Sequence, residues 1–317
     1  MGIKNIIKKI VGYELREKIH KKKVYRQFKK EYKTENRRTL VERKFKEKMG
    51  YNIELDNPQT FNEKITWMKV NWYSPLAITC SDKWAVKEYL RQNGYEDIVP
   101  KTFGVWSDPK KIKFKTLPNK FILKTNHGCG DCYICRDKNE LNKKQAIKEL
   151  REDFYYEYSA VAQEWTYDGI TPKVFCEELL EEDGRTPYDY KIICNNGKAK
   201  FLYVCKRYDC KIGNLELNYY DREFNLIPCK QHYPNITIKL EKPKNYEKMI
   251  ALAEELSKPF PFVRVDFYNI DGKLYFGEFT FFPSGGALAF EPEEYDKVLG
   301  DMIELPEKQE TPFNHEK

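Results

Sequence analysis

The 317-residue sequence lacks the apolar segments that mark membrane-spanning and secreted chains. No stretch approaches about eighteen consecutive apolar residues, and no short apolar core with a small-residue cleavage site follows the start. We therefore expect neither a transmembrane span nor a secretory signal. An internal repeat and a low-complexity tract are absent as well. The composition, 41% hydrophobic and 33% charged, predicts a globular chain long enough for two or three domains.

The chain has nine cysteines, an odd number, scattered between Cys80 and Cys229. A chain of this size does not need disulfides to be stable, so we expect the reduced thiols of a cytosolic protein. Cys129, Cys132 and Cys135 have the C-x₂-C-x₂-C spacing of some zinc and iron–sulfur sites. The next cysteine is Cys176, and no fourth ligand stands nearby. We therefore favour packing over metal binding for these three.

The charge is unevenly distributed along the chain. Residues 1–50 contain 18 Lys and Arg against 6 Glu, a net charge of +12, whereas the remaining residues carry 38 basic and 43 acidic groups, a net charge of −5. A basic arm therefore precedes a mildly acidic globule, and the overall value of +7 describes neither part.

The arm begins with apolar residues that recur every three or four positions: Ile3, Ile6, Ile7, Ile10 and Val11. With the lysines between them they predict a cationic amphipathic helix, which could lie on an anionic membrane surface or dock on the globule. A nucleic-acid-binding arm would carry a similar charge. However, Tyr25, Phe28 and Tyr32 fall at helical spacing, which favours packing over base stacking, and we expect no nucleic acid partner.

Beyond about residue 80 the pattern is mixed α and β. We expect helices over residues 81–94, 141–162 and 244–257. Alternation and turn residues predict strands over 101–106, 120–125, 132–136, 173–180, 188–194, 198–206, 262–269 and 273–282. Turns at 195–197 and 271–272 predict two hairpins.

The segment FILKTNHGCG, residues 121–130, places a lysine next to a glycine-containing loop. The Lys124 ammonium and backbone N–H groups around Gly128 and Gly130 could surround a phosphate. An ordinary hairpin would have a similar sequence, and the segment is not a Walker A loop because no Gly-Lys-Ser/Thr follows. On its own, the segment leaves both interpretations open.

The segment FVRVDFYNIDGKLYFGEFTFFPSGG, residues 262–286, carries charged groups within strands that otherwise look buried. Asp266 and Glu278 could supply oxygen ligands to Mg²⁺, or both could pair with Arg264 in an ion-pair network. A shared metal requires the two carboxylates on one face of the hairpin. With a regular two-residue turn at Asp271-Gly272 they would face opposite sides unless a bulge resets the alternation.

Several motifs together resemble one family, the TupA-like ATP-grasp group, which is associated with teichuronopeptide and surface-polysaccharide synthesis. They are SDK at 81–83, FILKTNHGCG at 121–130, EELL at 177–180, DYK at 189–191, RVDFY at 264–268 and GEFTFFPSGG at 277–286. The resemblance implies an α+β fold in which two subdomains sandwich a nucleotide, preceded by a helical region. It implies the following parts: a basic helical arm over 1–50, a helical or α+β segment over 51–110, a lid subdomain over 111–185, a large subdomain with the magnesium site over 186–306, and a loose tail over 307–317.

The resemblance also implies roles for particular residues. Lys83, Lys124 and Lys191 would contact ATP phosphates, and a loop containing Asn126, Gly128 and Gly130 would cover them. The adenine would be framed by Glu177, Glu178, Leu179 and Leu180. Asp266 and Glu278 would hold Mg²⁺, with Thr280 where many ATP-grasp ligases have asparagine. Arg264 would steady an acyl phosphate, and His127 would either touch a phosphate or stabilise its loop. Asp189 and Lys191 share a strand face and could simply pair.

The implied activity is an ATP- and Mg²⁺-dependent ligase that joins a carboxylate to an amine. Its expected substrates are a carboxylate-bearing saccharide or lipid-linked glycan and an amine or amino acid. We expect a cytoplasmic protein, peripheral on the inner face of the membrane through residues 1–30. The alternatives are a phosphotransferase or glycosyltransferase of the same pathway, although the D-x-D motif common in glycosyltransferases is missing, and a non-catalytic nucleotide-binding scaffold.

Overall fold

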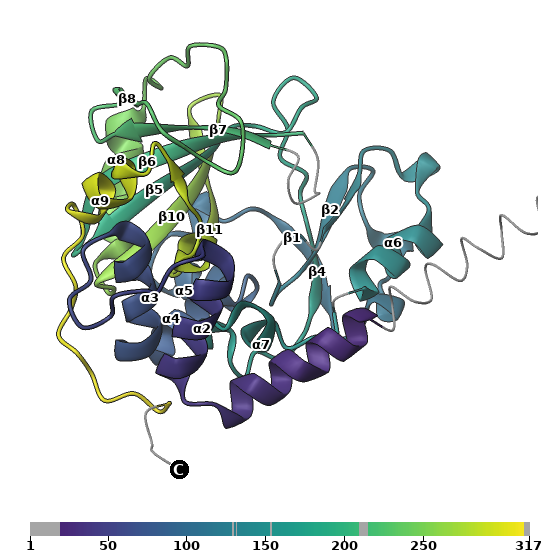
Figure 1. Cartoon of the computed structure of the whole chain (residues 1–317). Helices are drawn as coiled ribbons and strands as arrows, with labels where there is room; N and C mark the ends of the chain where they lie inside the picture. The colour runs from purple at the N-terminus through teal and green to yellow at the C-terminus, as the bar shows by residue number, and fades with distance from the viewer. Residues whose placement is uncertain (1–19, 129, 131, 153, 209–214, 314–317) are drawn as a thin grey trace, which may run out of the picture.

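The computed structural model describes residues 20–128, 130, 132–152, 154–208 and 215–313. The amphipathic helix predicted near the start of the arm lies outside these residues. Two antiparallel sheets lie side by side, with helices α2–α5 beneath them (Figure 1). Besides a helix over residues 20–34, the helices are α2 (Arg37–Met49), α3 (Phe61–Asn71), α4 (Pro75–Ser81), α5 (Ala85–Gln92), α6 (Lys143–Arg151), α7 (Tyr158–Ala162), α8 (Tyr246–Ser257) and α9 (Glu294–Gly300).

The smaller sheet has the strand order β1-β4-β2-β3. Its strands are β1 (Thr102–Trp106), β2 (Phe121–Thr125), β3 (Cys132–Cys135) and β4 (Val174–Glu177). Alternate residues of β2, among them Phe121 and Leu123, are buried in a core that includes Ala146 and Leu150 of α6. This burial holds α6 against the sheet.

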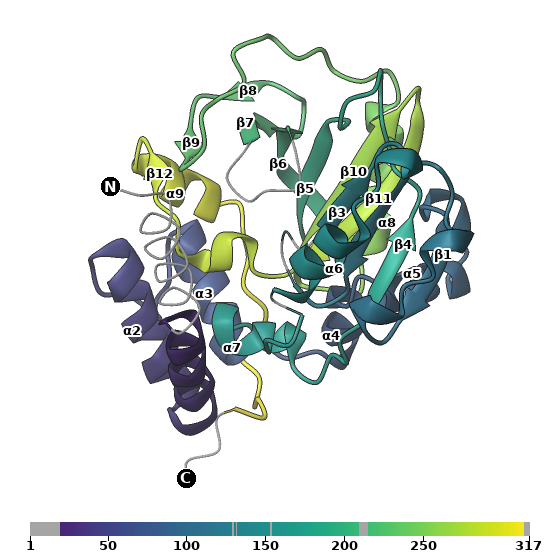
Figure 2. The same cartoon turned by 90° about the vertical axis from the view of Figure 1, so that its right-hand side faces the viewer.

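The larger sheet has the order β11-β10-β5-β6-β7-β8. Its strands are β5 (Asp189–Asn195), β6 (Lys198–Arg207), β7 (Leu215–Asp221), β8 (Leu226–Ile227), β10 (Phe262–Ile270) and β11 (Lys273–Thr280). Helix α8 packs on one face through Met249, Ile250 and Ala253, which leaves the other face free to build a site. A short pair, β9 (Lys230–Gln231) and β12 (Phe290–Glu291), lies beside this sheet (Figure 2).

Most strands coincide with the predicted ones, but two predicted helices are wrong in extent. Helix α5 begins at Ala85, because Oδ1 of Asp82 accepts hydrogen bonds from the backbone N–H groups of Trp84 and Ala85 at 2.8 and 3.0 Å, while Ser81 ends α4. The single helix predicted over 141–162 is two, α6 and α7, because the chain leaves the helix between them and buries Phe154 in the core of the smaller sheet. Strand β7 was not predicted at all.

The helix over residues 20–34 docks on the segment that contains α7 (Figure 1). The ring of Tyr25 lies 4.5 Å from that of Tyr156, and Tyr32 donates a hydrogen bond to Asp168 at 2.9 Å. The interpretation of the arm's aromatic residues as packing residues is therefore confirmed.

The tail is not loose over its described residues. The backbone N–H of Gln309 donates to the carbonyl of Asn71 at 2.9 Å, and the ring of Phe313 lies 5.7 Å from that of Tyr73. Thr311 is buried. Partners on α3 and just after it, which the polar tail sequence does not reveal, hold the segment in place.

Six described cysteines are free, and all of them are buried: Cys80, Cys135, Cys176, Cys194, Cys205 and Cys229. Cys132, however, is disulfide-bonded, so the expectation of reduced thiols is wrong at this position. Among the residues that the structure describes, no group of three or more His, Cys, Asp or Glu is arranged to hold a metal. None of the helices in these ranges combines the length and the apolarity that a membrane crossing requires.

Candidate functional site

A cavity of about 340 Å³ lies between the two sheets. Its charged lining residues come from both sheets and from the segment before α5: Lys83, Lys124, Glu177, Asp189, Lys191, Arg207, Arg264, Asp266 and Glu278. The lining on β7 and on the segments that contain β9 and precede β12 is uncharged: Leu215, Leu217, Tyr219, Gln231, Tyr233 and Leu288. A cavity of this size with convergent polar groups has the character of a small-molecule site.

Strand alternation explains which residues face the cavity. Every second residue near the end of β6 lines the cavity: Tyr203, Cys205 and Arg207. The same period of two applies to the neighbouring strands, where the lining residues are Asp189 and Lys191 of β5 and Arg264, Asp266 and Tyr268 of β10. Because α8 covers the opposite face, these alternate residues are directed into the site. Arg207 and Tyr203, which sequence reasoning missed, share this periodicity. Alternation along the predicted strand 198–206 could have indicated Tyr203, whereas Arg207 lies one residue beyond that strand.

Two of the predicted metal ligands, Asp266 and Glu278, lie on one face of their hairpin. Ile270 pairs with Lys273 across a regular two-residue turn, but the register shifts between Val265 and Phe267. Gly277 and Glu278 together therefore stand opposite Asp266, in the manner of a β-bulge. A Cβ atom at position 277 would lie 3.1 Å from the backbone oxygen of Asp266, so glycine permits this close approach. The bulge resets the alternation, as a shared site requires.

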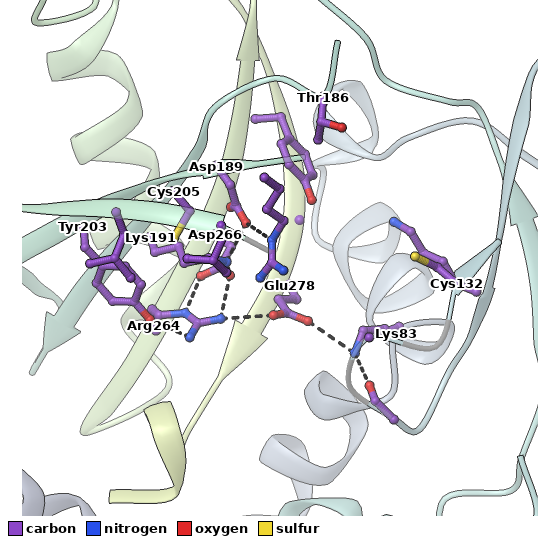
Figure 3. A pocket seen from close by; sticks show the side chains of 18 of the residues that line it. Lys83, Cys132, Thr186, Asp189, Lys191, Tyr203, Cys205, Arg264, Asp266 and Glu278 are labelled. Atoms are coloured by element: carbon purple, nitrogen blue, oxygen red, sulfur yellow. Dashed lines mark hydrogen bonds and ion pairs between the residues drawn. The ribbon is translucent and has the colours of Figure 1, made fainter. Parts of the chain in front are cut away.

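Arg264 links these carboxylates (Figure 3). Its Nε and one Nη donate to the two oxygens of Asp266, both at 2.7 Å, and the same Nη donates to Glu278 at 3.0 Å. The other Nη donates to the hydroxyl of Tyr203 at 2.7 Å. The ion-pair network considered from the sequence is therefore present in this structure, on the face where a metal would bind.

Lys83 connects the loop after β2 to the charged cluster of Arg264, Asp266 and Glu278. Its Nζ donates to the carbonyl of Gly128 at 2.6 Å and lies 3.3 Å from a carboxylate oxygen of Glu278. Burial disfavours the charged form of Glu278, but Lys83, Lys191 and Arg264 outweigh it and lower the pKa of this carboxyl well below its usual range. Glu278 is thus held ionised between two parts of the fold.

Lys191 is a buried partner of two carboxylates. Its Nζ lies 2.7 Å from Asp189 and also pairs with Asp266. Burial alone would lower the pKa of Lys191, but Asp189 and Asp266 raise it above its ordinary value. The pairing of Asp189 with Lys191 that the sequence suggested is observed, and Lys191 still lines the cavity. Arg207 lies 3.7 Å from Asp189 and adds a further cation.

The loop after β2 separates into residues that line the cavity and residues that hold the loop. Gly128 and Gly130 line it. The side chain of Asn126 is fully buried and is used to fix the loop: it donates to Asp82 at 2.9 Å and accepts from the backbone of Lys173 at 2.6 Å. His127 is buried, its Nδ1 lies 3.2 Å from Asn126, and its ring meets that of Phe154 edge-on. Burial lowers the pKa of His127, which favours the neutral ring.

Glu177 differs from the other residues of its motif. Its buried carboxylate pairs with Lys124 at 2.7 Å, and it lines the cavity. Glu178 faces the preceding segment instead, where its side chain accepts from the backbone of Lys101 at 2.7 Å. Glu178, Leu179 and Leu180 do not line the cavity in this structure, nor do Asn126, His127 and Thr280. Their roles as nucleotide, catalytic or metal residues stay predictions.

The carboxylates fit a hard cation by their chemistry and position. Asp266 and Glu278 share one face, and Mg²⁺ typically takes one or two carboxylates together with substrate phosphates, so a larger protein cluster is not needed. Asp189 Oδ1 is buried without a hydrogen-bond partner, which leaves a further oxygen of this cluster unused. Their negative charge is balanced here by Arg264, Lys191 and Lys83.

Comparison with known proteins gives a family and several similar folds. Comparison with curated protein sequences finds no match. A structure of D-alanine–D-alanine ligase from Bacillus anthracis is 16% identical to this chain with a TM-score of 0.39, and the match covers 78% of this chain and 69% of the ligase. A second structure of this ligase, complexed with ATP, is 15% identical with a TM-score of 0.41, and the match covers 78% of this chain and 68% of the ligase. The ATP-grasp ligase PsnB complexed with a precursor variant, Mg and ADP is 13% identical with a TM-score of 0.41, and the match covers 76% of this chain and 64% of PsnB. Residues 63–304 match the TupA-like ATP-grasp family. The chain, with its two α+β parts and preceding helices, belongs to that family.

Proposed function

We propose that this protein is an ATP- and Mg²⁺-dependent ligase that joins a carboxylate to an amine through an acyl phosphate. The observation that carries the proposal is the bulge opposite Asp266, which places Asp266 and Glu278 side by side next to Arg264 in a cavity that also contains Lys83 and Lys124. Cations that can hold phosphates and carboxylates that can hold Mg²⁺ are thus adjacent.

The residues of the cavity would have different roles in the reaction. Lys83, Lys124 and Lys191 would bind the ATP phosphates, and Asp266 and Glu278 would hold Mg²⁺, which neutralises phosphate charge when bound. The substrate carboxylate would attack the γ-phosphorus, ADP would leave, and the amine would then displace phosphate to form the amide. Arg264, fixed by Asp266 and Tyr203, is positioned to stabilise the negative charge of the transferred phosphoryl group.

The uncharged part of the cavity lining, on β7 and the segment that contains β9, is the natural place for the acceptor. Tyr219 donates to Gln231 at 2.7 Å, and Gln231 donates to the carbonyl of Leu288, so these polar groups hold one another in place beyond Arg264. With the family's association with surface polysaccharides, we propose a carboxylate-bearing saccharide or lipid-linked glycan as one substrate and an amine or amino acid as the other. The pathway would be capsular or other cell-surface polysaccharide, or teichuronopeptide, biosynthesis.

The test is turnover by the purified protein with MgATP, pooled amino acids and uronic-acid acceptors. We expect ADP and phosphate only when both a carboxylate and an amine are present, whereas release of AMP would contradict the acyl-phosphate mechanism. Glu278→Ala should lower turnover by at least about 100-fold. Glu241→Gln, at an exposed glutamate away from the cavity, is the control. Wild-type turnover in Glu278→Ala would remove the metal assignment.

We also propose that the arm places the enzyme on the inner face of the cytoplasmic membrane. The helix over 20–34 uses Tyr25 and Tyr32 to dock on the globule and leaves an exposed row of cations at helical spacing: Lys22, Arg26, Lys30 and Lys33. Anionic lipids attract each such residue by about 1 kcal/mol near the surface. A lipid-linked substrate would then be held close to the enzyme.

A further inference from the structure

A buried carboxylate at the end of β4 is shared between two lysines from different elements. One oxygen of Glu177 lies 2.7 Å from Nζ of Lys124 on β2, and the other pairs with Nζ of Lys87 on α5. Glu177 and Lys87 are both buried, with side chains 4% and 5% exposed. Lys124 and Glu177 line the cavity, whereas Lys87 does not. Lys87 can therefore affect a ligand in the cavity only through its ion pair with Glu177.

The charges of the three groups do not cancel. Burial disfavours ionisation of Glu177, but Lys124 and Lys87 lower the pKa of its carboxyl to about 2, so it is negatively charged at neutral pH. A pair made of Lys124 and Glu177 alone would be neutral and would offer an incoming phosphate no net charge. The second lysine gives the cluster a net charge of +1.

Stability alone does not explain the position of Lys87. Removing an ammonium group from water is costly, and burial lowers the pKa of Lys87. Its Nζ lies 5.8 Å from the ring centre of Phe175, so part of its surroundings is apolar. A buried lysine in such a place indicates a role in the charge of the neighbouring site.

We propose that Lys87 is a positioning residue for the polyphosphate of the nucleotide. Lys87 neutralises Glu177, so the ammonium group of Lys124 is free to bind phosphate. When Lys124 binds phosphate, Glu177 still has Lys87 as its partner and is not left as an unpaired buried charge. The inference rests on the proposed function in that the ligand is ATP. It adds Lys87, a residue outside the cavity, as a determinant of the affinity for the phosphates rather than for the adenosine part of the nucleotide.

The test compares binding of ADP, adenosine and inorganic tripolyphosphate by calorimetry. Lys87→Met should weaken ADP and tripolyphosphate binding by about tenfold or more and leave adenosine binding within about twofold. Lys87→Met combined with Glu177→Gln removes the unpaired carboxylate, so it should restore most of the affinity for tripolyphosphate. Lys87→Arg should bind like the wild type. Lys69→Met, which removes another buried lysine paired with a glutamate, should lower stability without changing the ratio of ADP to adenosine affinity.

The possible failures are distinct. If Lys87→Met binds ADP and tripolyphosphate as the wild type does, or if the double variant is as weak as the single one, the positioning role is wrong. If Lys87→Met does not fold, the double variant and Lys87→Arg decide the question. If the wild type binds tripolyphosphate but neither ADP nor adenosine, the proposed function fails while the comparison of variants still tests Lys87. If the wild type binds none of the three, both are overturned.

Discussion

At the scale of single residues, the charged lining of the cavity is a nearly balanced set of buried and partly buried ions. Each carboxylate has at least one cationic partner, as Asp266 has in Arg264 and Lys191 and Glu278 has in Lys83. Removing one member leaves its partner buried and unpaired, which costs more than removing both. Substitutions here will therefore be strongly non-additive, and paired variants are more informative than single ones.

The lowered pKa of Glu177 has a consequence for acid stability. Its folded-state pKa of about 2 lies below the ordinary value of 4.5, so the unfolded chain binds the proton more readily between these pH values. The stabilisation that Glu177 contributes is therefore present above about pH 4.5 and is lost as the pH falls towards 2. The full loss is on the order of a few kcal/mol.

This dependence can be measured by urea unfolding between pH 2 and 7. Glu177→Gln should be less stable than the wild type at pH 7, and its unfolding free energy should fall less steeply below pH 4.5. Glu241→Gln serves as an exposed control and should follow the wild-type curve. Parallel curves for the wild type and Glu177→Gln would mean that Glu177 is not ionised in the folded protein.

Residues that belong to motifs were easier to predict than residues that act through a neighbour. Lys83, Lys124, Asp266 and Glu278 line one cavity as the sequence suggested, because motif and strand pattern both indicate them. Lys87 is one charged residue on an amphipathic helix, and only its contact across the fold with Glu177 distinguishes it. The burial of Asn126 depends on partners at Asp82 and Lys173, which are distant in sequence.

At the scale of secondary-structure elements, the bulge between β10 and β11 is the feature on which the site depends. Gly277 faces the backbone of Asp266, where a Cβ atom would be only 3.1 Å from its oxygen. The strands and their turn could be predicted from alternation and from Asp271-Gly272, but the sequence left the register open, because the bulge is set by close packing. The single helix predicted over 141–162 failed for a related reason, since burial of Phe154 outweighs local helix propensity.

Gly277→Ala tests this dependence on the bulge. The added methyl group should push Asp266 away and lower the unfolding free energy by about 1–3 kcal/mol. Turnover should fall by more than this loss of stability explains, because Asp266 and Glu278 would no longer be side by side. Chemical denaturation and turnover at a temperature where the variant is fully folded separate the two effects. Unchanged turnover would show that their relative position is not important.

The docking of the helix over residues 20–34 can be tested with a matched pair of tyrosines. Tyr32→Phe removes the hydrogen bond to the partly buried Asp168, and we expect a loss of about 1 kcal/mol in unfolding free energy. Tyr155→Phe removes a similar bond to Asp108, but Tyr155 is 54% exposed, so the loss should be close to zero. Equal effects in the two variants would contradict the docking of this helix as a source of stability.

At the scale of the whole molecule, net positive charge is concentrated in residues 1–50 and net negative charge in the rest of the chain. The two parts are in contact, since Lys29 pairs with Glu157 and Arg38 pairs with Asp56. Folding does not bury the exposed row of Lys22, Arg26, Lys30 and Lys33, which points to attraction by an external anionic surface. The distribution of charge was evident from composition alone. Where the arm docks was not, since Tyr156 and Asp168 are more than a hundred residues away.

Vesicle sedimentation tests whether this surface binds lipid. Charge reversal of Lys22, Arg26, Lys30 and Lys33 to Glu should lower binding to vesicles containing phosphatidylserine by at least about tenfold and leave turnover on a soluble acceptor unchanged. Reversal of four exposed lysines near the smaller sheet, Lys110, Lys111, Lys113 and Lys115, is the control and should matter little. Binding that is equal for neutral and anionic vesicles, or absent in the wild type, would overturn the membrane proposal.

The buried free cysteines can be used to measure local opening of the structure. Burial raises the pKa of the thiols of Cys80, Cys176, Cys194 and Cys229 to about 12, so at neutral pH an alkylating reagent reaches a thiolate there only when the surrounding structure opens. Cys176 lies in the smaller sheet and Cys194 lies in the larger one, and neither lines the cavity. Alkylation rates read by mass spectrometry at each position would therefore time the opening of the two sheets separately, with and without nucleotide.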